Sequence, residues 1–169
     1  MTEQRKTQER RSKRVSVEET LGSIAKGDLG ELFRFWVGKE ARAPKSAALL
    51  REQVAAQMGN AETLKTKVAG LGSRHEAILT CHLRAPRFQC SRTDLVNAQE
   101  LNYLSNYDLD AAILMLQRCG LLTQALGSNA LEYGTKTTAI TSEVGESLTR
   151  SIRSEQRGIF DAFTLRGHL

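Results

Sequence analysis

Apolar residues recur at helical spacing along most of this chain, and that periodicity constrains its fold more than any other feature. One segment shows the i, i+3, i+4, i+7 spacing that aligns side chains in a single stripe on an α-helix: Leu29, Leu32, Phe33 and Trp36. Only two prolines occur among the 169 residues, and Ala, Leu, Glu, Lys and Arg, which favour helices, are frequent. The sequence therefore predicts a mainly α-helical protein.

Start and stop signals divide this pattern into successive helices. A serine followed three residues later by a glutamate forms a capping box, which predicts helix starts at Ser16 and at Ser73. Asp28 is expected to begin another helix, and Gly158 to end the last one. The stretches predicted to be helical are 16–25, 28–37, 47–58, 61–69, 73–85, 91–104, 108–119 and 142–157.

Two segments favour extended structure instead. Residues 87–90, RFQC, are expected to form a short strand. The runs 121–126 and 131–140 flank the turn sequence GSNA, an arrangement that is typical of a β-hairpin. The sequence thus predicts a small sheet beside the helices.

Basic residues concentrate at the beginning of the chain. Residues 1–14 hold six lysines and arginines against two glutamates, a net charge of +4, whereas the whole chain carries +5. The other 155 residues are therefore nearly neutral, which argues against a folded body that binds polyanions strongly. Residues 1–15 also lack hydrophobic periodicity and are predicted to form a disordered arm, which either contacts phosphates weakly or has no specific role.

Composition limits the classes of protein to consider. No apolar run approaches the ~20 residues that span a bilayer, and the polar N-terminus does not resemble a secretory signal. The three cysteines, Cys81, Cys90 and Cys119, lack paired spacing and are typical of reduced thiols. We expect a cytoplasmic protein without membrane contact, with the nucleoid or the nucleus as alternative locations.

No motif in the sequence indicates catalysis or a cofactor. The glycine-containing segment GLGSRHE lacks the lysine and the preceding strand of a phosphate-binding loop. Four residues that bind zinc elsewhere lie close in sequence but fit no familiar zinc spacing: His75, Cys81, His82 and Cys90. Adjacent Cys81 and His82 would point about 100° apart on a helix, which suits a nucleophile and its base poorly. We expect a non-enzymatic protein without metal, cofactor or small-molecule substrate.

From Ser73 to Ile140, the predicted order of helix, short strand, helix, helix and hairpin resembles a winged-helix domain. The segment GLL…ALEYGTKTTAITSEVGESL is similar to the end of many winged-helix regulators, where Gly-Leu-Leu closes the third helix before a β-hairpin wing. The resemblance implies a helix-turn-helix unit whose third helix, 108–119, would enter DNA. Such regulators often pair through terminal helices, a role that Ser142–Arg157 could serve.

Residues 21–58 resemble a SAP-type unit, in which a Leu-rich helix and a loop precede a lysine and a second amphipathic helix. The matching positions are Asp28, Leu29, Leu32, Pro44, Lys45, Leu49, Leu50 and Val54. The loop is longer than is usual in that family, and Ala43-Pro44 replaces its glycine. The resemblance implies DNA binding, as in accessory regions of DNA-processing proteins. The predicted parts are a basic arm (1–15), a SAP-like unit (16–60), a winged-helix-like domain (61–158) and a tail (159–169).

The predicted third helix, 108–119, suits base recognition poorly. Asp108 and Asp110 lie at its N-terminal end, where they complement the helix dipole but would face phosphates. Its inner stripe is predicted to be Leu109, Ala112, Ile113 and Leu116. Leu114 and Leu121 are expected on the opposite side, and a helix that is apolar nearly all round is usually covered. We therefore predict that Leu114 and Leu121 contact a partner.

The primary functional hypothesis is a non-catalytic DNA-binding adaptor that contacts phosphates with little sequence readout and recruits a protein partner. Its expected nucleic-acid contacts are Arg10, Arg11, Lys13, Arg14, Lys45, Arg51, Arg118 and Lys136. One alternative is a protein-interaction or homo-oligomerisation module, including a homodimer, without a nucleic-acid role. The other is a sequence-specific winged-helix transcription regulator, which requires base contacts from Gln117, Arg118 or the wing.

Overall fold

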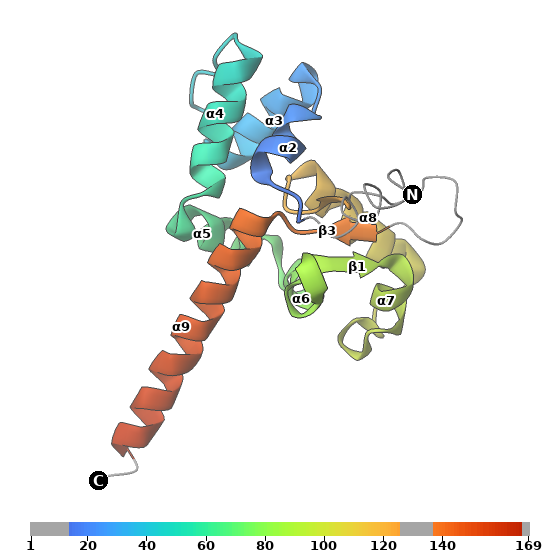
Figure 1. Cartoon of the computed structure of the whole chain (residues 1–169), viewed down its shortest axis with the longest axis vertical. Helices are drawn as coiled ribbons and strands as arrows, with labels where there is room; N and C mark the ends of the chain where they lie inside the picture. Colours follow the sequence, from blue (N-terminus) through green and yellow to red (C-terminus); the bar gives the residue numbers. More distant parts are fainter. Residues whose placement is uncertain (1–13, 126–136, 167–169) are drawn as a thin grey trace, which may run out of the picture.

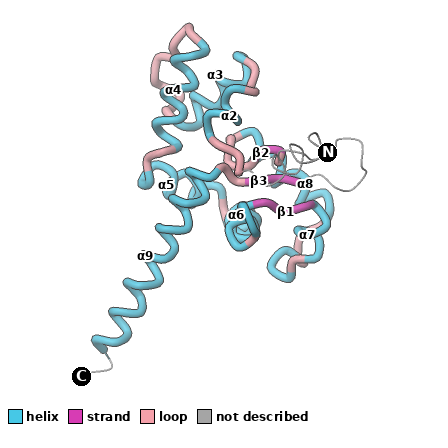
Figure 2. The backbone as a smooth tube through the Cα atoms, in the orientation of Figure 1, coloured by secondary structure: helices cyan, strands magenta, loops and turns pink. Residues whose placement is uncertain are grey.

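The computed structural model describes residues 14–125 and 137–166, with side chains as far as Glu155. In these ranges the fold is mainly helical, as predicted, with a small antiparallel sheet (Figures 1 and 2). The helices are α2 (Val17–Gly22), α3 (Lys26–Trp36), α4 (Ala47–Met58), α5 (Ala61–Leu71), α6 (Ser73–Arg84), α7 (Arg92–Asn97), α8 (Asn106–Arg118) and α9 (Ser142–Arg166). The same ranges contain the 3₁₀ turns η1 (Pro86–Phe88) and η2 (Gln99–Leu101) and the strands β1 (Gln89–Ser91), β2 (Thr123–Gln124) and β3 (Thr137–Ala139).

The first apolar stripe of the sequence forms the buried side of α3, which packs against α4. All four of its predicted members are buried: Leu29, Leu32, Phe33 and Trp36. The predicted start at Asp28 is wrong. The Leu29 N–H donates to the Ala25 carbonyl (3.0 Å), so α3 begins at Lys26 and Asp28 lies inside its first turn.

The two predicted capping boxes have different outcomes. Ser16 does cap α2, since its Oγ accepts a hydrogen bond from the Glu19 N–H (3.1 Å). Ser73 does not cap α6, because the Glu76 N–H donates to the Gly72 carbonyl and places Gly72 at the cap position. Gly72 has a φ of 105°, a conformation that glycine adopts without strain. Backbone geometry therefore moved this helix start by one residue.

The strands form one antiparallel sheet in the order β1-β3-β2. Cys90 lies opposite Thr138, and Gln124 lies opposite Thr138 on the other edge of β3. The predicted pairing of the two hairpin arms is thus present, while the predicted turn at 127–130 lies outside the described residues. β1 begins at Gln89 rather than at residue 87, because Arg87 and Phe88 adopt positive φ in the η1 turn.

The predicted helix 91–104 is interrupted after two turns. α7 begins with a complete capping box between Ser91 and Asp94 but ends at Asn97, and Ala98 is extended (φ −68°, ψ 125°) before η2. The break buries Leu95 and Leu101 together and leaves Val96 44% exposed. Val96 therefore lies on the solvent side, because the chain turns where a continuous helix was expected.

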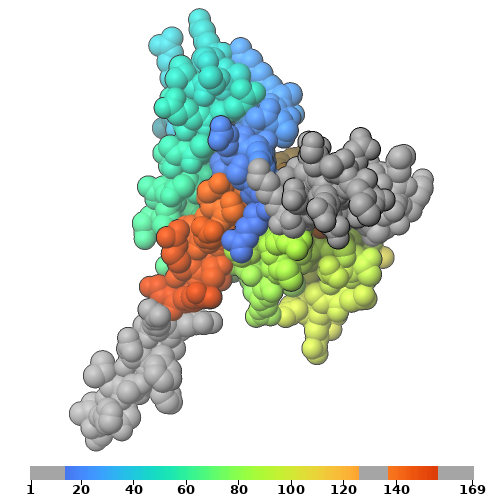
Figure 3. Space-filling view, in the orientation of Figure 1, coloured from blue at the N-terminus to red at the C-terminus, as the bar shows by residue number. Residues whose placement is uncertain are grey.

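The N-terminal segment and α9 support each other. The Ser142 N–H donates to the Val15 carbonyl (2.8 Å), and the Val17 N–H donates to the Glu143 carboxylate (2.8 Å). Figure 3 shows this segment (blue) between the first turns of α9 (orange) and the α6–β1 region (green). Val15 is buried and Arg14 pairs with Glu146, so these two residues belong to the folded body and not to the predicted arm. The rest of the predicted arm lies outside the described residues.

The last helix is longer than predicted and extends away from the body (Figure 1). α9 continues through Gly158 to Arg166, so the predicted stop at Gly158 is wrong. Residues 159–166 of the predicted tail are helical. A single glycine inside a helix costs only about 1 kcal/mol relative to alanine, which is too little to end a long helix by itself. None of the described helices is long and apolar enough to cross a membrane.

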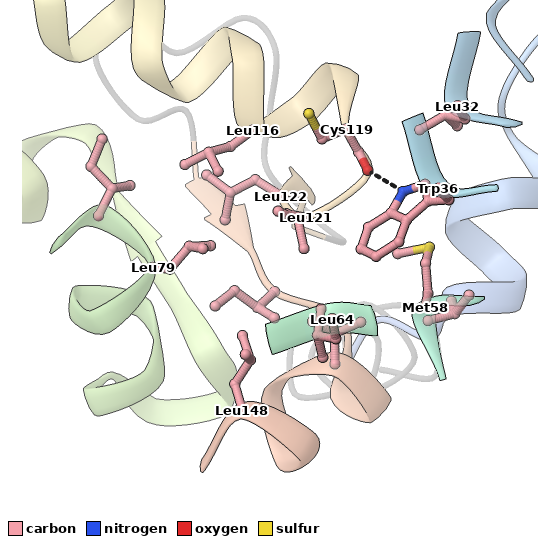
Figure 4. Packing of buried hydrophobic residues seen from close by; sticks show 14 of the residues in the cluster. Leu32, Trp36, Met58, Leu64, Leu79, Leu116, Cys119, Leu121, Leu122 and Leu148 are labelled. Carbon is pink, nitrogen blue, oxygen red and sulfur yellow. Dashed lines mark hydrogen bonds between the residues drawn. The ribbon is translucent and has the colours of Figure 1, made fainter. Parts of the chain in front are cut away.

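Side chains from both predicted units share one hydrophobic core, drawn in Figure 4. The Trp36 indole Nε1–H donates to the Cys119 carbonyl (2.8 Å) and joins α3 to the end of α8. Met58, at the end of α4, contributes to the same cluster as Leu122. Residue 60, the predicted boundary, thus lies within a continuously packed molecule, and α8 packs on the core that both sides share.

Candidate functional site

The most distinctive surface of the described residues is the outer side of α8. Ser105 caps this helix, since its Oγ accepts from the Asp108 N–H (3.1 Å), and α8 therefore begins two residues before the predicted start. Leu109, Ala112 and Leu116 are buried, as the periodicity predicted, and Ile113 is partly buried against the same core. These four positions fix which side of α8 faces away from the protein.

The C-terminal end of α8 turns the chain back into the core. Gly120, with a φ of 75°, lets the Leu121 N–H donate to the Leu116 carbonyl (3.0 Å) and the Gly120 N–H to the Gln117 carbonyl (3.1 Å). This pair of bonds is the Schellman motif, which packs the residue after the glycine against the last turn. Leu121 is consequently only 1% exposed. The prediction that Leu121 contacts a partner is wrong, because this turn removes it from the helix surface.

Opposite the core, α8 presents a stripe that is largely apolar. Tyr107 is 81% exposed and Leu114 is 48% exposed, and Ala111 and Arg118 are exposed between and beyond them. The spacing of 107, 111, 114 and 118 places all four on one helical face. We call these four residues the outer stripe. Sequence analysis identified Leu114 and Arg118 but missed Tyr107, because the helix was expected to begin after it.

Acidic side chains flank this stripe and are engaged by arginines from neighbouring helices. Asp110 accepts two hydrogen bonds from Arg92, at 2.9 and 3.1 Å, in a bidentate pair. This contact raises the pKa of the Arg92 guanidinium, mainly through the hydrogen bond to Asp110. Asp108 lies 3.8 Å from Arg74. The arginines nearest the N-terminal end of α8 therefore neutralise carboxylates of α8 itself.

A hollow of about 750 Å³ lies at the other end of α8. It is lined by Gln117 and Arg118 of α8 and by residues of the α2–α3 corner, which include Asp28 and Glu31. Among the described residues Arg118 forms no ion pair, although these two carboxylates line the same hollow. The charge around the end of α8 is thus mixed rather than strongly basic.

The other cations expected to contact DNA lie apart from α8. Lys45 is exposed in the segment before α4. Arg51 is half-buried, and its Nε–H donates to the Leu21 carbonyl (3.1 Å), so part of its guanidinium caps the end of α2. Arg14 pairs with Glu146 (3.3 Å) and lies 5.0 Å from the centre of the Phe88 ring. The remaining predicted contacts lie outside the described residues: Arg10, Arg11, Lys13 and Lys136.

His82 and the cysteines of α6 and β1 lie in or beside the hydrophobic core. His82 is fully buried, with Nδ1 2.8 Å from the Ile78 carbonyl and Nε2 2.7 Å from the Thr138 hydroxyl. Burial lowers the pKa of the His82 ring. Burial raises the pKa of the Cys81 thiol and raises the pKa of the Cys90 thiol to about 12. A thiol of this kind is protonated at neutral pH and is a poor nucleophile or metal ligand. In the described part of the chain, no group of three or more His, Cys, Asp or Glu could hold a metal ion.

Comparisons of this chain with protein-family models, with curated proteins and with solved structures found no match.

Proposed function

We propose that this protein is a non-catalytic adaptor in which the outer stripe of α8 contacts a protein, while basic residues elsewhere contact DNA phosphates weakly. The observation that carries the proposal is the composition of the outer stripe. Tyr107, Ala111 and Leu114 are exposed on a helix that is fixed to the core on its other side. Exposed aromatic and aliphatic side chains that form a continuous patch are typical of protein-interaction sites.

The architecture supports a winged-helix interpretation of α6 to β3. The order α6, β1, α7, α8, β2, β3 follows the predicted order of helix, strand, helix, helix and hairpin, with α8 as the third helix, and β3 pairs with both β1 and β2. In a DNA-reading domain, this helix presents cations and amides to base edges. Here Asp108 and Asp110 lie at its N-terminal end, and Arg118 is its only cation. Protein contact therefore suits this face better than base recognition.

The DNA contact that the SAP-like interpretation of α3 and α4 implies rests mainly on one exposed cation, Lys45. Lys45 precedes α4, near backbone N–H groups that the N-terminus of a helix leaves available to an anion. Arg51 is a weaker candidate than expected, because its Nε is used by the Leu21 carbonyl. Residues 1–14 supply the largest local excess of positive charge in the sequence. Together these residues support weak, salt-dependent binding of DNA without sequence readout.

The test is a fluorescence anisotropy titration of a labelled duplex at two salt concentrations. We expect Lys45→Ala and removal of residues 1–13 each to weaken binding. Each should also flatten the dependence of log K on log salt, by about 0.9 for every phosphate that the protein no longer neutralises. Leu114→Ala and Arg118→Ala are expected to leave the affinity within about twofold, since those positions would contact protein. Lys65→Ala, which removes an exposed lysine that pairs with Glu155, is the matched control.

Two results would contradict the proposal. Affinity that is unchanged after both the Lys45 substitution and removal of the arm would exclude the phosphate contacts. A larger loss from Leu114→Ala or Arg118→Ala than from Lys45→Ala would instead place α8 in a groove and favour a sequence-specific regulator.

A further inference from the structure

The N-terminal segment meets α9 at a charged surface that lies apart from α8 and from Lys45. We propose that residues 1–13, Arg14 and two arginines of α9 form one surface that binds the phosphate backbone of duplex DNA. This inference rests on the proposed contact of the N-terminal residues with DNA. It adds two binding residues, Arg150 and Arg153, and the side of the molecule along which the duplex lies.

Four charged residues follow one another on a single face of α9. Glu143, Glu146, Arg150 and Arg153 are separated by three, four and three residues, a spacing that aligns side chains along one side of a helix. All four side chains are exposed. We call Arg150 and Arg153 the arginine stripe. Arg157 continues the spacing in the sequence, beyond the side chains that the structure describes.

The two carboxylates of this face are engaged within the protein. Glu143 accepts a hydrogen bond from the first backbone N–H of α2 (2.8 Å), and Glu146 accepts one from Arg14 (3.3 Å). The Arg150 Nε–H donates to the main-chain carbonyl of Glu146 (3.4 Å). Among the side chains that the structure describes, neither Arg150 nor Arg153 forms an ion pair. The positive charge of the arginine stripe therefore remains available to an anion.

Arg14 joins the arginine stripe to the N-terminal residues. Its guanidinium contacts Glu146 and lies 5.0 Å from the centre of the Phe88 ring, whose face attracts a cation. Phe88 is itself close against α9, since a Cβ added at Gly145 would lie 2.3 Å from its ring. Residues 1–13 precede this point and hold five lysines and arginines against two glutamates, a net charge of +3. The basic segment thus begins on the same face of α9 as the arginine stripe.

Carboxylates on the neighbouring side of α9 do not cancel the arginine stripe. A hollow of about 610 Å³ between α5 and α9 is lined by Arg150 and by four glutamates, two of which belong to the charged face described above. Of the other two, Glu155 accepts from Lys65 (2.7 Å). The pKa of Lys65 is raised, mainly by the hydrogen bond to Glu155, and Glu62 adds to the effect. Lys65 therefore compensates the acids on this side.

The dimensions of the arginine stripe suit a nucleic-acid backbone. From Arg150 to Arg157 the helix rises about 10 Å, and one DNA strand carries a phosphate about every 3.4 Å along the duplex axis. The segment therefore matches the length of about three phosphates. Figure 1 shows that α9 extends away from the body, so a duplex can lie along it. α4 and α9 extend from α5 in opposite directions, so Lys45, which precedes α4, can be tested separately (Figure 1).

The experiment is a fluorescence anisotropy titration of a labelled DNA duplex with the full chain at two salt concentrations. The double variant Arg150→Gln/Arg153→Gln removes two charges and keeps residues that favour helices. Binding at the lower salt concentration should weaken at least about fivefold, and the slope of log K against log salt should fall by about 1.8, or 0.9 for each phosphate. Arg150→Lys/Arg153→Lys retains both charges and should bind within about threefold of the wild type. Lys65→Ala, which removes a cation on the other side of α9, is the control and should bind like the wild type.

A gain of affinity provides a second arm that loss of folding cannot imitate. Glu146→Gln removes a carboxylate from the charged face and releases Arg14 from its ion pair. Arg14 can then neutralise a further phosphate, so binding should become tighter and the salt slope steeper by about 0.9.

Three outcomes would overturn the proposal: a double Gln variant that binds with the affinity and salt slope of the wild type, a double Lys variant as weak as the double Gln variant, or weaker binding by Glu146→Gln. Tighter binding of the wild type to an RNA duplex of the same sequence, or to vesicles that contain phosphatidylserine, would also overturn DNA as the ligand. The Lys45→Ala titration separates this inference from the proposed function. A loss with Lys45→Ala and none with the α9 variants would remove only the arginine stripe, whereas the reverse would remove only the Lys45 contact.

Discussion

At the scale of single residues, His82 shows how a polar side chain is accommodated in this core. Its ring lies between α6 and β3. When Nδ1 carries the proton and donates it to the Ile78 carbonyl, Nε2 accepts a hydrogen bond from the Thr138 hydroxyl. Both contacts require the neutral ring in that arrangement, and burial lowers the pKa of His82 from its ordinary value of 6.5. The histidine therefore contributes to stability only while it is uncharged.

This protonation behaviour predicts a pH dependence of folding. Because the folded pKa is lowered, the contribution of His82 is fully present above about pH 6.5 and decreases as the pH falls below that value. The free energy of unfolding, measured with urea between pH 7.5 and 5.5, should fall by at most about 1.4 kcal/mol per pH unit, the limit for one proton. His82→Gln should be less stable at pH 7.5 and should lose most of this dependence. An equal decrease in both proteins would assign the effect to another group.

At the scale of the elements, the periodicity of apolar residues predicted the buried sides of α3 and α8, because the residues that a helix buries recur at a spacing that can be read in the sequence. Helix ends were predicted less well. α7 stops at Asn97 although no proline or glycine follows it there, and α9 passes through Gly158. The burial of Leu121 depends on the turn at Gly120, and the Arg92–Asp110 contact joins residues 18 apart. Such contacts arise only when the elements are placed in space.

The packing of α9 on η1 gives a prediction at this scale. A Cβ added at Gly145 would lie only 2.3 Å from the Phe88 ring, whereas nothing lies within 4 Å of a Cβ added at Gly30 in α3. Gly145→Ala should therefore destabilise the protein by about 2 kcal/mol through overpacking. Gly30→Ala, the matched control, should stabilise it by about 0.5–1 kcal/mol, because alanine favours helices. Thermal unfolding tests both, and two changes of the same sign would contradict this account of the contact.

At the scale of the whole molecule, the predicted SAP-like and winged-helix-like units behave as one packed body. The hydrogen bond from Trp36 to Cys119 and the shared core of Met58 and Leu122 join segments on either side of residue 60. The hydrogen bonds of Val15 and Val17 tie the N-terminal segment to α9. We infer that neither unit buries its apolar surface without the other.

This continuity predicts one cooperative unfolding transition. Denaturation followed by Trp36 fluorescence and by far-ultraviolet circular dichroism should give coincident curves, as expected of a two-state domain. A fragment of residues 61–169 should lack cooperative unfolding, because it loses Leu32, Trp36 and Met58, which belong to the same hydrophobic cluster as Leu121 and Leu122. Two separated transitions, or a fragment that unfolds cooperatively, would show that the units are independent.

The central claim is that the outer stripe of α8 is a protein-contact surface rather than a base-reading surface. Amide chemical shifts in a two-dimensional nitrogen–proton NMR spectrum test it most directly, since the same signals can be followed while duplex DNA is added. The account predicts that the Ala111 and Leu114 amides remain in place when DNA is added, whereas the amides next to Lys45 shift. Shifts of the Ala111 and Leu114 amides with DNA, together with no change next to Lys45, would contradict it.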